Sequence, residues 1–108
     1  MINALIPQLY SKGQMKRVKY RRFGLLDEQH AISLLFFVDE NEEVNATDLR
    51  DVSGSYYSIN ALAQLMAAEG FLEMDVVEDP RKVITYRITP KGKRIAAKLK
   101  EIEGIVEG

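Results

Sequence analysis

The 108-residue chain has no cysteine, no tryptophan, one histidine and three prolines. Without cysteine it can form neither a disulfide framework nor a thiolate metal site. His30 alone cannot build a catalytic or metal centre, and the sequence has no glycine-rich phosphate loop. We therefore expect a protein that is not an enzyme and that holds no cofactor and no metal.

Long apolar runs are also missing, since no segment approaches the roughly 20 apolar residues of a membrane span. The first ten residues include Asn3 and Pro7 and lack the basic start of a secretory leader. We therefore expect a cytoplasmic protein without a membrane partner. A hydrophobic content of 46% suffices for one compact core, so residues 1–108 are expected to form a single domain.

Charge is spread unevenly, although the net charge is only −1. Residues 1–22 carry six basic and no acidic side chains, residues 23–79 one basic and thirteen acidic, and residues 80–108 eight basic and three acidic. Two basic ends therefore flank an acidic middle. Such a balance argues against a protein that coats nucleic acid through charge alone.

Helical spacing of apolar residues appears first within residues 1–11, where the stripe consists of Ile2, Leu5, Ile6 and Leu9. The basic stretch 14–22 suits a strand or a flexible arm equally well. Asp27 is then expected to cap a core helix with the body His30–Val38, ended by the acidic loop Asp39–Glu43.

The middle of the chain predicts a short helix, a tight turn and a longer helix. Asn45 and Asp48 have the spacing of a capping box for the short helix. The turn is residues 53–55, and Gly70 is the expected left-handed residue that ends the longer helix near Glu69.

Two alternating segments, Phe71–Glu78 and Lys82–Thr89, predict strands joined at Pro80. Thr89 should cap a last helix with Pro90 in its first turn. The apolar stripe of that helix has the spacing of a seam that packs along another helix, and it consists of Ile95, Leu99, Ile102 and Val106.

Helix, short helix, turn, helix and hairpin is the order of a winged helix-turn-helix, whose third helix enters the major groove of DNA. Three segments resemble the MarR-type regulators: Ala68–Glu73 the end of the recognition helix, Glu78–Val83 the wing tip, and Tyr86–Gly92 the L-T-x-x-G exit. The resemblance covers Leu26–Leu99, and the PadR-like group is a near alternative.

The fold class that follows is mainly α with a small β-hairpin wing (α+β), a winged helix-turn-helix with extra N-terminal and C-terminal dimerisation helices. Its parts are an N-terminal helix and basic arm at 1–25, the winged helix-turn-helix at 26–89 and a C-terminal dimerisation helix at 90–108. The resemblance implies a homodimeric, sequence-specific regulator of transcription that binds double-stranded DNA. It also allows a small-molecule effector, which the sequence does not identify.

The recognition helix is expected at about Ser55–Glu69 and the wing at about Glu78–Val83. Matched to the family, the groove-facing positions are Ser55, Tyr56, Tyr57, Asn60, Ala61 and Gln64. The expected wing and phosphate contacts are Arg81, Lys82, Lys16, Arg17, Lys19, Arg21 and Arg22. The expected dimer interface combines the two apolar stripes at the ends of the chain.

One departure from the family keeps an alternative open, because residues 55–69 contain neither Arg nor Lys. Asn60 and Gln64 could read adenine, or they could be solvated polar residues on an exposed helix. Adjacent helical residues point about 100° apart, so one of Tyr56 and Tyr57 can face the core. The acidic middle would also suit a winged-helix module that binds a protein partner and no DNA.

Overall fold

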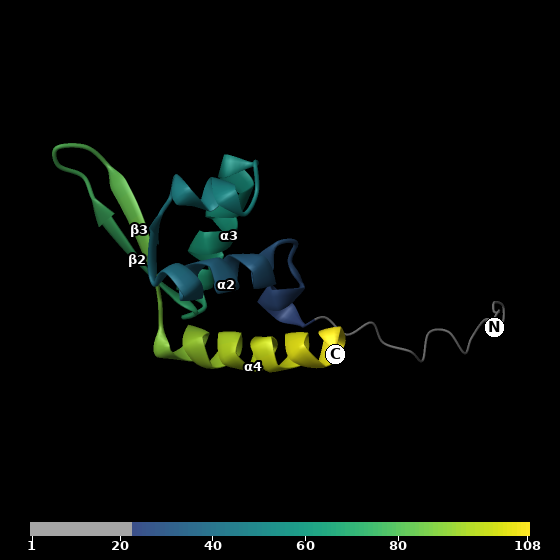
Figure 1. The fold of residues 1–108 in the computed structure, drawn as a ribbon. Helices are drawn as coiled ribbons and strands as arrows, with labels where there is room; N and C mark the ends of the chain where they lie inside the picture. The colour runs from purple at the N-terminus through teal and green to yellow at the C-terminus, as the bar shows by residue number, and fades with distance from the viewer. Residues whose placement is uncertain (1–22) are drawn as a thin grey trace, which may run out of the picture.

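The computed structural model describes residues 23–108 (Figure 1). The predicted N-terminal helix and basic arm lie outside the described residues. The elements, in chain order, are the 3-10 turn η1 (Gly24–Asp27), α2 (Ala31–Asn41), β1 (Glu43–Asn45), the 3-10 turn η2 (Asp48–Asp51), α3 (Tyr56–Ala68), β2 (Leu72–Val77), β3 (Val83–Ile88) and α4 (Pro90–Glu107).

Helix α2 lies between α3 on one side and α4 on the other (Figure 1). It can do so because it is apolar around most of its circumference: Leu34, Leu35 and Val38 have no exposed surface. Ile59 and Met66 of α3 and Ala96 of α4 complete the buried cluster around it. The expectation of a central core helix is confirmed.

The start and the end of α2 both differ from the sequence expectation. Asp27 lies in η1 and does not cap α2, which begins after His30 in a left-handed conformation with φ of 71°. The helix then runs through the predicted acidic loop to Asn41, whose amide donates to the Phe37 carbonyl at 2.8 Å. Glu42, with φ of 66°, makes the turn out of the helix.

The sheet has three antiparallel strands in the order β1-β3-β2. The hairpin of β2 and β3 agrees with the prediction to within one residue at each end, whereas β1 was not predicted. In the register, Tyr86 of β3 lies opposite both Val44 of β1 and Met74 of β2. Tyr86 is fully buried, and β1, which also contacts α2 and η2, joins the β2–β3 hairpin to the helical part of the fold.

The predicted hydrogen bonds between Asn45 and Asp48 are present, but Asn45 is not the N-cap. The Asn45 amide donates to the Asp48 carboxylate at 2.9 Å and the Asp48 amide donates to the Asn45 side chain at 2.8 Å, whereas Thr47 precedes the single 3-10 turn η2 and Asn45 belongs to β1. The predicted cap of the last helix is confirmed. At α4, the Thr89 hydroxyl accepts from the Gly92 amide at 3.0 Å. Gly70, with φ of 87°, follows α3 as expected.

Helix α4 is fixed to α2 by one carboxylate. Asp39, whose side chain is 12% exposed, accepts from Lys93 at 3.2 Å and from Lys100 at 3.1 Å. Burial would raise the pKa of Asp39, but the hydrogen bonds and charges of Lys100 and Lys93 outweigh it and lower the pKa below its ordinary value. The carboxylate thus stays ionised between two lysines that lie two turns apart on α4.

Candidate nucleic-acid interface

The outward face of α3 carries no charge. Its exposed residues are Tyr57, Ser58, Ala61, Gln64, Leu65 and Ala68. Tyr57 is 85% exposed and Leu65 51% exposed. At 100° per residue these positions span about one third of the helix circumference, opposite Ile59, Ala63 and Met66. Ser55 precedes the helix in an extended conformation and is also exposed.

Asn60 departs from the expectation that it shares an exposed face with Gln64. Its side chain is 7% exposed, and its amide donates to the carbonyls of Tyr56 at 2.9 Å and Ala46 at 3.3 Å. Asn60 therefore ties α3 to the segment before η2. Because a base edge cannot reach a buried amide that is already bonded, we correct the prediction and remove Asn60 from the groove-facing set.

The two adjacent tyrosines point in different directions. Tyr56 is half-buried and packs against the core, whereas Tyr57 projects into solvent, with the two rings edge to face at 5.6 Å. The guanidinium of Arg50 in η2 lies 5.0 Å from the centre of the Tyr56 ring. This geometry holds a cation beside the start of α3.

A cleft of about 500 Å³ separates this corner from the wing. Its lining residues are Asn45, Ala46, Thr47, Tyr56, Arg81, Lys82, Val83 and Ile84. Arg81 and Lys82 are exposed and form no ion pair within residues 23–108, and the same holds for Arg50. Two unpaired cations therefore line the cleft between the start of α3 and the wing, and a third, Arg50, lies over the ring of Tyr56 at its border.

Arg50 was missed by the sequence reasoning. A signal was nevertheless present, because it is the one basic residue between positions 23 and 79 and it lies just before the turn that leads to α3.

The other basic residues along β3 and α4 mostly have acidic partners. Arg87 is held between Glu43 and Glu73 at 3.4 Å from each, and Lys98 lies 3.7 Å from Glu101.

Acidic residues occupy the same side of the molecule. Asp48 and Asp51 lie in η2, and Glu78 and Asp79 lie at the wing tip. Asp48 accepts from the Asn45 amide and forms no ion pair with Arg50. The described residues carry nine basic and sixteen acidic side chains in all. Local placement, and not total charge, makes the cleft cationic.

The predicted seam of α4 divides into two parts. Ile95 and Leu99 pack against the core, whereas Ile102 is 53% and Val106 78% exposed. Ile105, which was not predicted, is 79% exposed. The stripe Ile2, Leu5, Ile6 and Leu9 lies outside the described residues, as do Lys16, Arg17, Lys19, Arg21 and Arg22.

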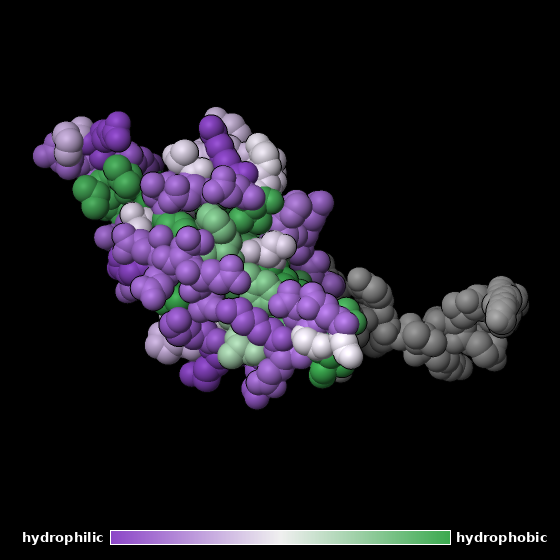
Figure 2. Space-filling view, viewed as in Figure 1, coloured by the Kyte–Doolittle hydropathy of each residue, from purple (hydrophilic) through white to green (hydrophobic). Residues whose placement is uncertain are grey.

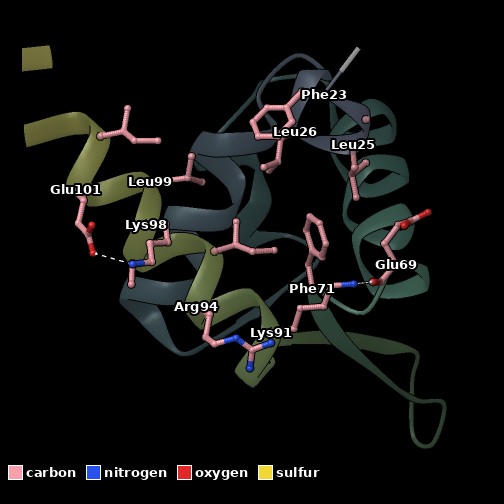
Figure 3. Close-up of a pocket in the computed structure, with 14 residues that line it drawn as sticks. Phe23, Leu25, Leu26, Glu69, Phe71, Lys91, Arg94, Lys98, Leu99 and Glu101 are labelled. Carbon is pink, nitrogen blue, oxygen red and sulfur yellow. Dashed lines mark hydrogen bonds and ion pairs between the residues drawn. The ribbon is translucent and has the colours of Figure 1, made fainter. Parts of the chain in front are cut away.

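A larger apolar groove, of about 910 Å³, runs between α4 and η1 (Figure 3). Phe23 and Leu26 border it on the η1 side, Phe71 at its base, and Leu99 on α4. In Figure 3 the aliphatic and aromatic side chains point into the space, while Arg94 and the Lys98–Glu101 pair lie at its outer edge. The groove is an apolar surface beside the exposed end of the seam.

Within residues 23–108, no group of His, Asp and Glu side chains is placed to hold a metal ion. His30 is exposed at the start of α2. No helix in this part of the chain is long and apolar enough to cross a membrane.

Comparison with solved structures decides the fold. The transcriptional regulator homologue from Pyrococcus horikoshii OT3 superimposes with a TM-score of 0.67 over 81% of this chain and 89% of its own, at 13% sequence identity. A protein described as the transcriptional regulator ytfH from Salmonella typhimurium gives a TM-score of 0.66 over 77% of this chain and 75% of its own, at 19% identity. The fold is a winged helix.

In this winged helix, η2 and α3 form the helix-turn-helix, and the β2–β3 hairpin is the wing. The fold is therefore α+β, as the sequence predicts. No protein-family model and no curated protein matches the chain. Identities of 13% and 19% make these likenesses of fold.

Proposed function

We propose that this winged-helix chain is a DNA-binding regulator of transcription that reads double-stranded DNA with α3. The observation that carries the proposal is the set of unpaired cations, Arg50, Arg81 and Lys82, around the cleft beside the exposed face of α3. Four other cations of the described residues, Arg87, Lys93, Lys98 and Lys100, neutralise carboxylates, whereas these three form no ion pair within residues 23–108 and lie together beside α3. Phosphate groups are the partners that such cations take in duplex DNA.

In this proposal α3 lies in the major groove and the wing tip lies against the backbone or the minor groove. Tyr57 and Ser55 are placed at the leading end of α3, where hydroxyl groups can reach phosphates. The two similar structures are described as transcriptional regulators, which supports the same assignment. The MarR-type likeness of Tyr86–Gly92 remains part of the proposal, with the PadR-like group as its alternative.

We further propose that the regulator acts as a homodimer in the cytoplasm. The exposed residues Ile102, Ile105 and Val106 at the end of α4, together with the groove beside them, support a second copy as the partner. Two copies would place two α3 helices on one face of the duplex, as successive major grooves require. The basic residues of the 14–22 stretch would add phosphate contacts.

One observation favours a second candidate, a winged-helix module that binds a protein. Figure 2 shows apolar surface along the wing behind its hydrophilic tip, where Val76, Val77 and Val83 are 40%, 49% and 38% exposed. Exposed apolar patches rimmed by polar residues are typical of protein interfaces. The uncharged face of α3 would suit the same use.

Titration of a mixed-sequence duplex with the full chain, from low to physiological salt, tests the proposal. A DNA-binding winged helix should bind at low salt, with an affinity that falls linearly on logarithmic axes as salt rises. Absence of duplex binding at low salt would overturn the proposal in favour of the protein-binding module.

A further inference from the structure

We infer that α3 selects A·T base pairs, with Gln64 reading adenine and with Ala61 and Leu65 contacting thymine methyl groups. The inference rests on the proposed DNA-binding function and specifies which DNA the site takes. It depends on what the outward face of α3 contains and on what it lacks.

The face lacks the side chains that read guanine. Guanine presents two acceptors in the major groove, which Arg or Lys recognises, and residues 55–69 contain neither. Arg50 does not replace them, because it lies in η2 and not on the outward face of α3. A helix of this composition gains little from a G·C pair.

Gln64 is the one exposed amide of α3 once Asn60 is buried. Its side chain also interacts with the buried Tyr86 hydroxyl, where it opposes the rise that burial causes in the pKa of Tyr86, so this contact has to yield when the amide turns to a base. A glutamine amide can donate to adenine N7 and accept from adenine N6. Gln64 can therefore form a bidentate pair with adenine.

Ala61 and Leu65 lie one turn apart on the same exposed face. Leu65 is 51% exposed, which leaves an aliphatic side chain in water in the unbound protein. The thymine C5-methyl is the one apolar group that a base pair presents in the major groove. Contact with it would remove apolar surface of both partners from water, and a G·C pair offers no equivalent.

The first experiment is selection of binding sites by the full chain from a random duplex pool near physiological salt. The expected result is enrichment of A·T pairs at the core of each half-site. Each thymine of the selected site is then replaced by deoxyuridine, which removes only the methyl group. A contacted methyl should cost about fourfold in affinity, from roughly 0.8 kcal/mol per buried methyl-sized group.

Variants assign the contacts to side chains. Leu65→Ala should remove the loss of affinity caused by deoxyuridine at the base pair that Leu65 contacts. The losses caused by deoxyuridine at the other base pairs should remain. Gln64→Ala should weaken binding to the selected site by about fivefold or more and leave binding to random DNA nearly unchanged. Gln64→Arg should shift the preferred pair at that position to G·C. Glu103→Gln, on exposed α4, is the control and should change none of these preferences.

Two results would overturn the inference while the proposed function stands: selection of a G·C core, or full affinity for the deoxyuridine duplex. Failure to bind any duplex at low salt would instead overturn the proposed function and the inference together. The two failures are distinguishable because the first requires measurable duplex binding.

Discussion

Helices α3 and α4 flank the same core helix, but they use charged residues in opposite ways. On α4, Lys93 and Lys100 hold Asp39 of α2 and Lys98 pairs with Glu101, so three of its five cations have a carboxylate partner within the protein. Around α3 the cations have no acidic partner, and the helix itself exposes no charge. The comparison teaches that the number of basic residues on a surface is a poor guide to anion binding. The better guide is whether each lysine or arginine already has an acidic partner within the protein.

The largest effect is expected at the exposed end of α4. Leu99→Glu together with Ile102→Glu should give a monomer or an unfolded chain, because one carboxylate enters the edge of the core and the other the proposed dimer seam. Ile102→Glu alone should leave the fold intact and change only association, since Ile102 is 53% exposed.

Sedimentation at tens of micromolar measures the association, and circular dichroism measures the fold. Glu103→Gln alters charge on the same helix without adding a carboxylate to the seam, so it should behave as wild type. A wild-type chain that sediments as a monomer would contradict the dimer proposal.

The next effect is expected at the cleft beside α3. Replacing Arg50, Arg81 and Lys82 together by Ala should reduce the salt dependence of duplex binding by up to about three units per protomer, at roughly 0.9 per phosphate contact. Affinity should fall alike on all sequences, because phosphate contacts carry no base information. A salt titration with fluorescently labelled duplex measures both quantities.

Lys98→Ala is the matched control, since Lys98 is paired with Glu101 on α4, and α4 lies on the other side of α2 from α3 (Figure 1). It should leave the salt dependence unchanged. If the control and the triple variant lost salt dependence and duplex affinity to the same extent, the cleft would have no special part in DNA binding.

Asn60 and Gln64 provide a smaller contrast on α3 itself. Asn60→Ala should lower the free energy of unfolding by about 1–3 kcal/mol, because the Ala46 and Tyr56 carbonyls lose a buried donor. Gln64→Ala should cost less free energy of unfolding than Asn60→Ala, because Gln64 is exposed and its internal contact is with the Tyr86 hydroxyl alone. Urea denaturation measures both, and an Asn60→Ala chain as stable as wild type would contradict the buried contact.

The smallest effect is expected for Asp39. Its pKa is lower in the folded chain than in the unfolded one, so its stabilising contribution is present above the unfolded value of about 3.9 and is lost as pH falls through the lower folded value. Asp39→Asn should cost about 1 kcal/mol or less at neutral pH, as is typical of partly exposed pairs. Urea curves at pH 7 and pH 3 should show the difference from wild type shrinking at the lower pH, and a difference independent of pH would contradict the assignment.

Local signals made most of the fold predictable from the sequence. The apolar spacing of α3, the left-handed Gly70, the alternation of β2 and β3 and the Thr89–Pro90 start of α4 each depend on neighbours in the chain. The winged-helix order followed from them.

What could not be predicted depends on contacts between distant segments. Strand β1 has three residues, and it exists because Glu43–Asn45 pair with residues of β3 that lie 40 to 44 positions later. Asn60 was misplaced because its partner, the Ala46 carbonyl, lies fourteen residues away. Arg50 was missed because its stacking on Tyr56 is visible only in three dimensions. The fold could therefore be predicted from the sequence more completely than the candidate site could.

The junction between the wing and α4 has a further consequence. The Thr89 hydroxyl lies 2.6 Å from the Gly70 carbonyl and 2.9 Å from the Phe71 carbonyl while accepting from Gly92, and a Cβ on Gly92 would overlap the Phe71 carbonyl oxygen. The end of α3, the root of the wing and the start of α4 therefore meet at one rigid joint. In a dimer built on α4, this joint would set the distance between the two α3 helices. That distance has to match one turn of DNA, about 34–36 Å.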